Sequence, residues 1–280
     1  MRTAGLSGMV FYHYWFTGKL ILEGPSQIVL QDKSIDMPFC FCWANENWSR
    51  RWDGNASEIL LGQYYSREDA KNFIEYLIPF FKDERYITVD GRPVLIIYKP
   101  SFIEEVADYL NIWNRILSEH GLPSVYLVAC ISTKDEFDYD AYDCFLERPL
   151  YDFGGGNIKD IKNSLELLQS DKCWVLQYED VVNYYINKVY KHNKKLWRSV
   201  VTSFDNTPRY GNRAYITHNS NPKLFEYWLT EMLKHSNGCQ CEFVIVNAWN
   251  EWGESAHLEP DLKYGYAYLN AVGRSLSHFK

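Results

Sequence analysis

Short apolar segments alternate with longer amphipathic segments along this chain of 280 residues. The apolar segments are rich in β-branched and aromatic residues, and seven of them predict β-strands. These segments span residues 8–15, 37–44, 92–99, 124–131, 142–148, 198–204 and 242–249. Their hydrophobicity is mostly continuous rather than alternating, which is typical of strands that are covered on both faces in a parallel sheet.

Four of the intervening segments predict helices, at residues 66–83, 101–121, 181–193 and 221–238. Ser66 is a candidate N-cap, with Asp69 three residues further on. Gly121 and Gly238 are candidate C-terminal residues, and Pro222 suits the start of the last helix. Strand followed by helix, repeated, predicts parallel strands joined by right-handed crossovers.

The expected fold class is therefore α/β, as one (β/α)8 TIM-type barrel domain over residues 1–280. Such barrels typically use about 250 residues. Only seven strands are predicted, and the first begins close to Met1. We therefore expect the domain to be N-terminally incomplete and to lack the first barrel strand.

The composition is that of a globular protein, with 46% apolar and 23% charged residues. A net charge of −7 gives no reason to expect a nucleic-acid partner. No run reaches the ~18–20 apolar residues of a membrane span, and the N-terminus lacks the layout of a signal peptide. The seven Cys form no disulfide framework. The pairs Cys40/Cys42 and Cys239/Cys241 are expected to be buried free thiols, which favours a cytoplasmic location.

Aromatic side chains follow the ends of the predicted strands, together with Asn, Asp, Glu and Arg. Function gathers at these ends in a parallel barrel. Pyranose faces lie on aromatic rings and sugar hydroxyls need paired donors and acceptors, so the mixture predicts an oligo- or polysaccharide partner. Any single one of these aromatic residues could equally cover the end of the barrel without binding a sugar. The candidate substrate-binding residues are Tyr12, His13, Tyr14, Trp15, Trp43, Asn45, Glu46, Trp48, Tyr98, Asp205, Asn206, Arg209, Asn247, Trp249, Asn250, Trp252, His257 and Glu259.

Glu251 and Glu254 are the candidate catalytic residues. If the chain turns helically here, their Cβ atoms lie about 5–6 Å apart, which is close to the ~5–5.5 Å of a retaining glycosidase pair. Two close carboxylates also raise one of the two pKa values, which keeps one Glu usable as an acid. An ordinary solvated loop is the alternative, but Trp249 and Trp252 favour a drier site.

No cofactor and no metal site is predicted. Asp138 and Asp140 have the D-x-D spacing used by metal-dependent sugar-nucleotide transferases, a spacing that is also common by chance. No motif has the ligand spacing of a zinc site. No G-x-S-x-G motif is present, so a serine hydrolase has no support.

Five motifs in order resemble the WbsX-like family of bacterial polysaccharide loci, which is related to family 99 glycoside hydrolases. They are "GMVFYHYWFTGKLILEGP", "FCFCWANENWSRRWDG", "GRPVLIIYKP", "FDNTPR" and "NAWNEWGESAHLEPD". The resemblance implies a (β/α)8 barrel and retaining chemistry on an α-mannosidic bond. It implies that Glu251 assists attack by the 2-hydroxyl of the sugar, giving an epoxide-like intermediate, and that Glu254 is the acid/base. Ser255 and Ala256 depart from the Gly and Thr of the hydrolases.

The leading hypothesis is a carbohydrate-active enzyme of surface-polysaccharide (O-antigen or capsule) metabolism, with hydrolysis and glycosyl transfer both open. A non-catalytic or degenerate sugar-binding barrel is the first alternative. A metal-dependent glycosyltransferase that uses Asp138 and Asp140 is the second.

Overall fold

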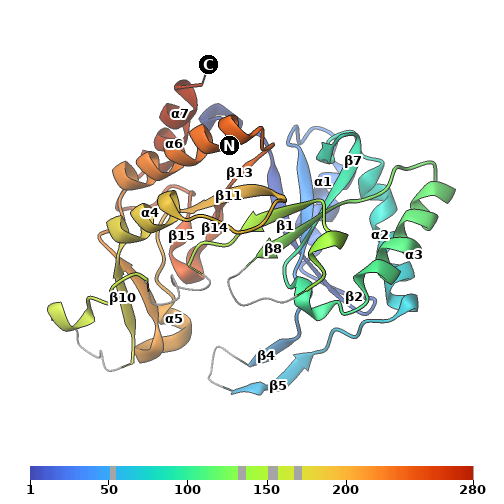
Figure 1. Cartoon of the computed structure of the whole chain (residues 1–280), viewed down its shortest axis with the longest axis horizontal. Coiled ribbons are helices and arrows are strands. Elements are labelled where there is room, and N and C mark those ends of the chain that lie inside the picture. The colour runs from blue at the N-terminus through green and yellow to red at the C-terminus, as the bar shows by residue number, and fades with distance from the viewer. Residues whose placement is uncertain (51–54, 132–136, 151–156, 167–171, 280) are drawn as a thin grey trace. The chain divides into compact units, whose positions relative to one another are not determined.

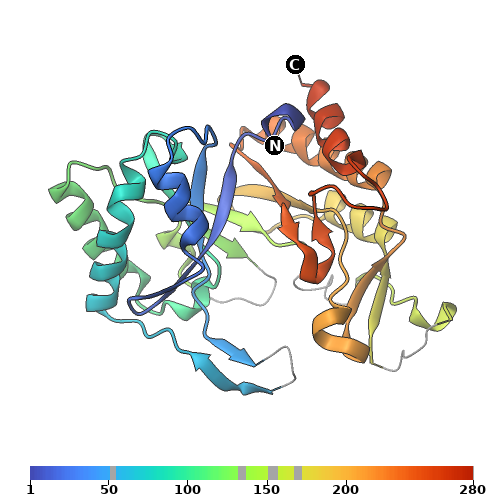
Figure 2. The same ribbon diagram turned by 180° about the vertical axis from the view of Figure 1, so that it is seen from behind.

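The computed structural model describes residues 1–50, 55–131, 137–150, 157–166 and 172–279. Contacts within the chain divide it into two compact units. The N-terminal unit comprises Ser7–Arg50 and Asn55–Leu146. The C-terminal unit comprises Met1–Leu6 and the described part of Glu147–Lys280. Figure 1 shows both units with many of their helices and strands labelled, and Figure 2 shows them from behind.

The N-terminal unit is built on a mostly parallel sheet in the order β9-β8-β7-β3-β1-β2, with β6 paired to β7. β1 with β3, β3 with β7, and β7 with β8 are parallel pairs, whereas β1 and β2 form an antiparallel hairpin. β4 and β5 form a separate antiparallel ribbon (Figures 1 and 2). The strands are β1 (Met9–Phe16), β2 (Lys19–Ile21), β3 (Phe39–Trp43), β4 (Trp48–Arg50), β5 (Asn55–Leu61), β6 (Thr88–Val89), β7 (Arg92–Ile97), β8 (Tyr126–Ile131) and β9 (Cys144–Glu147).

Helices pack against this sheet and against one another. The α-helices are α1 (Gly24–Gln31), α2 (Arg67–Phe81) and α3 (Val106–Glu119), and the short 3-10 helices are η3 (Pro100–Phe102) and η4 (Tyr139–Ala141). The Trp113 indole N–H on α3 donates to the Ala70 carbonyl on α2 over 2.9 Å. All five residues of β3 are buried, as expected of a strand in the middle of a covered parallel sheet.

The C-terminal unit contains two parallel strand pairs, β10 with β12 and β11 with β13, and one antiparallel hairpin, β14 with β15. The strands are β10 (Trp174–Gln177), β11 (Lys195–Val201), β12 (Tyr215–His218), β13 (Val244–Asn247), β14 (Asn250–Glu251) and β15 (Ala256–His257). The helices are η1 (Arg2–Ala4), η6 (Lys162–Ser164), α4 (Tyr178–Asn187), α5 (Thr207–Tyr210), η7 (Gly211–Arg213), α6 (Pro222–Cys239), η8 (Trp252–Glu254) and α7 (Ala267–Ser277).

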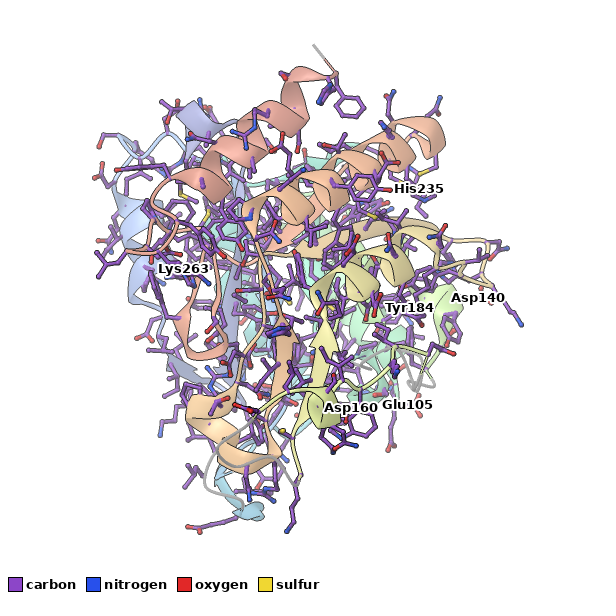
Figure 3. All side chains as sticks on the ribbon, turned by 90° about the vertical axis from the view of Figure 1, so that its left-hand side faces the viewer. Glu105, Asp140, Asp160, Tyr184, His235 and Lys263 are labelled. Carbon is purple, nitrogen blue, oxygen red and sulfur yellow. The ribbon has the colours of Figure 1, made fainter. Side chains whose placement is uncertain are left out.

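The core of the C-terminal unit lies between α4, α6, α7 and the neighbouring strands. The ring of Tyr185 on α4 stacks on that of Trp228 on α6, with 5.6 Å between centroids. Figure 3 shows these helices with Tyr184 labelled on α4 and His235 on α6. Arg198 and Glu147 form a buried ion pair at 2.9 Å, and Glu147 also accepts a hydrogen bond from Tyr190 over 2.7 Å.

The structure confirms the α/β class, all seven predicted strands, and parallel pairing within each unit. It also confirms the N-cap of α2, because the Ser66 hydroxyl accepts from the Asp69 N–H over 3.0 Å. Three of the four predicted helices differ in their ends. α4 spans Tyr178–Asn187 instead of residues 181–193, because Lys188 is extended. α3 begins at Val106 instead of Ser101, since residues 100–102 form η3. α6 continues through Gly238 to Cys239, and its C-cap Gln240 takes the left-handed conformation.

The cysteines agree only partly with the sequence prediction. Cys40 and Cys42 are buried free thiols, as predicted. The prediction was wrong for the second pair, because Cys239 is exposed and Cys241 is half-buried. Both cysteines lie at the C-terminal end of α6 and not in a strand. Their C-x-C spacing therefore does not place them within a sheet that could bury them. In the described part of the chain, no helix has both the length and the hydrophobicity needed to cross a bilayer.

Candidate active site

The two candidate catalytic residues lie in a tight hairpin that follows β13. β14 and β15 pair antiparallel, with Glu251 opposite Ala256, and the 3-10 turn η8 joins them. Ser255 completes the turn with a φ of +55°. The hairpin is closed at its base by the Leu258 N–H, which donates to the Ala248 carbonyl over 3.0 Å. The red hairpin beyond β13 is visible in Figure 2.

One arginine binds both carboxylates. The two terminal nitrogens of Arg209 donate separately, one to Glu254 Oε1 over 2.8 Å and the other to Glu251 Oε1 over 2.9 Å. The side chains of Glu251 and Glu254 are 37% and 25% exposed, so solvent reaches the pair without surrounding it. A planar guanidinium suits such paired recognition. The geometry therefore brings the predicted Glu pair and the predicted Arg209 together.

The environment of Glu254 gives its carboxyl a pKa that differs from that of an ordinary surface carboxyl. Burial raises the pKa of Glu254 above its usual value of 4.5, and the charge of Glu251 raises it further. The charges of Arg209 and Arg148 act in the opposite direction but do not cancel the effect of burial. A carboxyl that keeps its proton closer to neutral pH is suited to act as a general acid.

Trp252 lies between the two Glu in sequence and has one covered and one open face. Its ring stacks on the imidazole of His257 with 3.7 Å between centroids, while 49% of the residue remains exposed. The indole N–H donates to Glu259 over 2.7 Å. His257 Nε2 lies 3.2 Å from the carboxylate of Asp261. Burial tends to raise the pKa of Asp261, but hydrogen bonds from the Tyr264 N–H and from His257 hold it below its usual value. The hairpin thus presents a fixed aromatic platform.

The "FDNTPR" segment forms the support of Arg209. The Asp205 carboxylate accepts from the backbone N–H of Thr207 over 2.9 Å. Asn206 is buried and its side-chain oxygen accepts from the Tyr215 N–H over 2.7 Å. The predicted sugar contact of Asn206 is therefore not supported, because its amide oxygen is used inside the loop. Asp205 stays half-buried beside it.

The other predicted residues of the last strand differ in exposure. Asn247 ends β13 and is half-buried, and Asn250 is exposed. Trp249 packs against the core of the C-terminal unit. Its backbone carbonyl accepts hydrogen bonds from the Leu258 and Glu259 N–H groups. These two bonds hold the base of the hairpin in place.

The predicted substrate-binding residues of the N-terminal unit fall into an exposed group and a buried group. On β1 the face of the strand decides to which group a residue belongs. Successive side chains of a strand point to opposite faces, and Tyr12 and Tyr14 lie on the more exposed face of β1. Tyr12 meets Tyr98 edge to face at 5.5 Å, and Tyr14 meets Trp48 at 5.2 Å. Glu46 is half-buried. These five residues keep their predicted role in sugar binding as a prediction.

Four other predictions in this unit need correction, because the side chains are buried. His13 stacks on Tyr76 of α2 at 5.3 Å, and burial lowers the pKa of His13 to about 4. The Trp15 indole donates to the buried Asp69 over 2.8 Å. Trp43 has no exposed surface, and the Asn45 side chain binds both the N–H and the carbonyl of Lys99. These residues form the core beneath the strand ends and do not offer a face to a sugar.

The sequence analysis missed two residues of the candidate site, Gly253 in the hairpin and Asp261 beyond it. A Cβ on Gly253 would lie 2.9 Å from the Arg209 guanidinium nitrogen and 3.1 Å from Glu251 Oε1. Gly253 therefore leaves the space that the ion pairs occupy. The second is Asp261, which orients His257. In the sequence, Gly253 could have been noticed because it lies between the two Glu. Asp261 could have been noticed because it lies four residues after His257.

Asp138 and Asp140 have a local structural role. The Asp138 carboxylate accepts from the Asp140 N–H over 3.0 Å, which caps η4. Across the described ranges, no group of three or more His, Cys, Asp or Glu side chains is arranged to hold a metal ion.

Comparison with known families assigns the chain. Residues 1–272 match the sequence model of the family described as "Glycosyltransferase WbsX". The chain belongs to the WbsX family. This agrees with the resemblance carried by the five sequence motifs.

The curated relatives of this WbsX-family chain are longer. "Uncharacterized protein WxcX" from two strains of Xanthomonas campestris pv. campestris is 31% identical over 279 residues. The match covers 98% of this chain and 39% of the relative. The chain therefore spans about two fifths of the length of the curated relatives that it matches.

Solved structures share the fold of the WbsX-family chain. A "Glycoside hydrolase-like protein" aligns with a TM-score of 0.63 and 12% identity, covering 98% of this chain and 82% of its own. The GH99 endo-alpha-mannosidase of Bacteroides thetaiotaomicron aligns with a TM-score of 0.58 and 14% identity, covering 99% and 80%. At this identity the likeness shows the fold alone, an α/β fold like that of glycoside hydrolases.

Proposed function

We propose that this WbsX-family chain catalyses retaining glycosyl chemistry on a polysaccharide, with Glu251 and Glu254 as the reacting carboxyls. The observation that supports the proposal is the single guanidinium of Arg209, which holds both carboxylates in a partly exposed hairpin. A Glu pair with one pKa raised by burial is the arrangement that glycosyl chemistry uses.

In the proposed reaction, Glu254 gives its proton to the leaving glycosidic oxygen. Glu251 takes the proton of the sugar 2-hydroxyl while that oxygen attacks the anomeric carbon and the glycosidic bond breaks. In the second step Glu254 takes a proton from the incoming hydroxyl, whose oxygen bonds to the anomeric carbon as the bond between that carbon and the 2-oxygen breaks. Glu251 then returns its proton to the 2-oxygen. Both carboxyls end as they began, and two inversions at carbon retain the configuration.

An α-mannoside-like linkage is the proposed substrate, and the likeness to the GH99 endo-alpha-mannosidase supports it at the level of fold. A sugar hydroxyl is the proposed acceptor, with water as the competing one, in keeping with the description of the family as a glycosyltransferase. The (β/α)8 TIM-type barrel class of the fold belongs to this proposal. The parallel strand–helix repeats within each unit support it.

The test replaces each carboxyl by its neutral isostere. Glu251→Gln and Glu254→Gln are assayed against p-nitrophenyl α-mannoside and mannose-containing O-polysaccharide fragments, with products followed by mass spectrometry. Loss of a general acid or base typically lowers a rate by about 10²–10⁴-fold. We expect at least a 100-fold loss in each variant, on the same basis. Glu231→Gln is the matched control, because Glu231 lies on α6 and forms an ion pair with Lys234.

Three outcomes argue against the proposal. Unchanged turnover in both Gln variants would exclude the Glu pair. Saturable binding of the fragments without any turnover would favour a sugar-binding protein. Loss of activity on adding a chelator would favour the metal-dependent alternative with Asp138 and Asp140.

A further inference from the structure

Hydrogen bonds of the surrounding chain hold Arg209 close to both Glu251 and Glu254. Arg209 lies in α5, a single turn, and its backbone N–H donates to the Asn206 carbonyl over 3.0 Å. The Asp205 N–H donates to the Glu254 carbonyl over 2.8 Å. The Ser203 hydroxyl also donates to the Ser255 carbonyl. The loop that carries Arg209 is therefore bonded directly to the backbone of the turn that carries the Glu pair.

Each carboxylate uses only one of its oxygens on the arginine. Both hydrogen bonds from Arg209 end on Oε1 atoms. Among the residues that the structure describes, no hydrogen bond reaches the Oε2 atom of either Glu. One oxygen of each carboxyl is thus fixed to the protein, while the other remains available to a substrate.

Gly253 is part of the same arrangement. An alanine Cβ at this position would approach the Arg209 nitrogen to 2.9 Å and the guanidinium carbon to 3.3 Å. The guanidinium is the far end of a flexible side chain, so it would move away from a methyl group. Moving it would weaken the bonds to both carboxylates at once.

We propose that Arg209 is the positioning residue of the Glu pair, and that Gly253 is required for its approach. Arg209 anchors one oxygen of Glu251 and one of Glu254 so that the second oxygen of each faces the substrate. This inference rests on the proposed function of the pair, and it explains what the "FDNTPR" segment contributes to it. A lysine cannot replace Arg209, because one ammonium lacks the two-nitrogen fork.

The titration of Glu254 gives a readout that needs no substrate. The charged groups that act on it are Arg209, Glu251 and Arg148. Arg209 lowers the pKa of Glu254 and Glu251 raises it. Without Arg209 only Arg148 still offsets the repulsion from Glu251, so the pKa of Glu254 rises. An adjacent Arg typically lowers a carboxyl pKa by about 1–3 units, and partial exposure favours the low end of that range.

The experiment follows the side-chain carboxyl carbons by ¹³C NMR in protein labelled at Glu, with signals assigned through the two Gln variants. In Arg209→Ala the pKa of Glu254 should rise by about one unit, and Arg209→Lys should restore it only in part. Low-millimolar guanidinium chloride should reverse the change in Arg209→Ala, while the same concentration of sodium chloride should not. Gly253→Ala should raise the pKa less than Arg209→Ala does.

Gly238→Ala is the matched control, because a Cβ there meets nothing within 4 Å. Its titration should equal that of the wild type. An unchanged Glu254 titration in both Arg209→Ala and Gly253→Ala would overturn the positioning role, as would equal effects of the two salts. Such a result would leave the turnover test of the Glu pair standing. Conversely, full turnover in the Gln variants would end the proposed function without affecting the titration.

Discussion

At the scale of single residues, the hairpin shows which contacts a sequence can and cannot reveal. The two Glu are three positions apart, so their proximity could be predicted from spacing. Arg209 lies 42 and 45 positions before them, and nothing local predicts that one guanidinium reaches both. His13 and Trp15 were misjudged for a similar reason, because only the packing of α2 decides which face of β1 is covered.

Glu254→Gln is expected to stabilise the protein at neutral pH. Since burial raises the pKa of Glu254, the folded state holds this proton more tightly than the unfolded chain. That stabilising contribution is fully present below the usual value of 4.5 and is lost as pH rises through the folded pKa. Gln mimics the protonated form of Glu254. The free energy of unfolding of the variant should therefore exceed that of the wild type at neutral pH only.

Urea denaturation at several pH values checks this expectation. The difference in unfolding free energy between Glu254→Gln and wild type should be positive at neutral pH and should vanish at acidic pH. Glu231→Gln again serves as the control, with a difference within about 0.5 kcal/mol throughout. A Glu254→Gln variant that is less stable at neutral pH would contradict the role given to burial.

At the scale of elements, buried strands were predictable and short or exposed ones were not. "FCFCW" and "RPVLII" are apolar enough to be read directly, and both are almost wholly buried. β14 and β15 have two residues each, which is too short for any period. α7 was missed although four of its apolar side chains are buried, because no residue at its start caps it through a side chain.

Ser66→Ala tests a helix start that was both predicted and observed. The Ser66 hydroxyl accepts from the Asp69 N–H, and this bond satisfies a backbone donor that has no partner within the helix. Its loss should destabilise the protein by about 1 kcal/mol in urea denaturation. Ser66→Asp keeps an N-cap acceptor and should stay close to wild type. Equal losses in the two variants would show that the cap itself contributes little.

At the scale of the whole molecule, the chain comprises two compact units, and the candidate catalytic carboxyls belong entirely to one of them. The core of each unit hides most of the cysteines. Five of the seven are buried, and burial raises the pKa of Cys40 to about 12. The Sγ atoms of Cys239 and Cys241 are 2.8 Å apart at the surface end of α6.

Thiol titration with Ellman's reagent should therefore find two reactive cysteines in the native protein and all seven in denaturant. Cys241 should react slowly near neutral pH, since burial, together with the neighbouring Cys239, raises its pKa to about 11. Cys239→Ser/Cys241→Ser should abolish the native reaction. Reaction of more than two thiols before unfolding would contradict the burial of the other five.

The stacked pair of Trp252 and His257 also makes the hairpin an optical reporter. Among the Trp residues that the structure describes, five are buried, including Trp113 and Trp197, whereas Trp252 is 49% exposed on the turn between the two Glu. The emission of an indole changes when a ligand replaces water on its open face. A saccharide that binds beside the carboxyls would then alter fluorescence in the wild type but not in Trp252→Phe. Candidate sugars can thus be screened without a label and before any reaction is known.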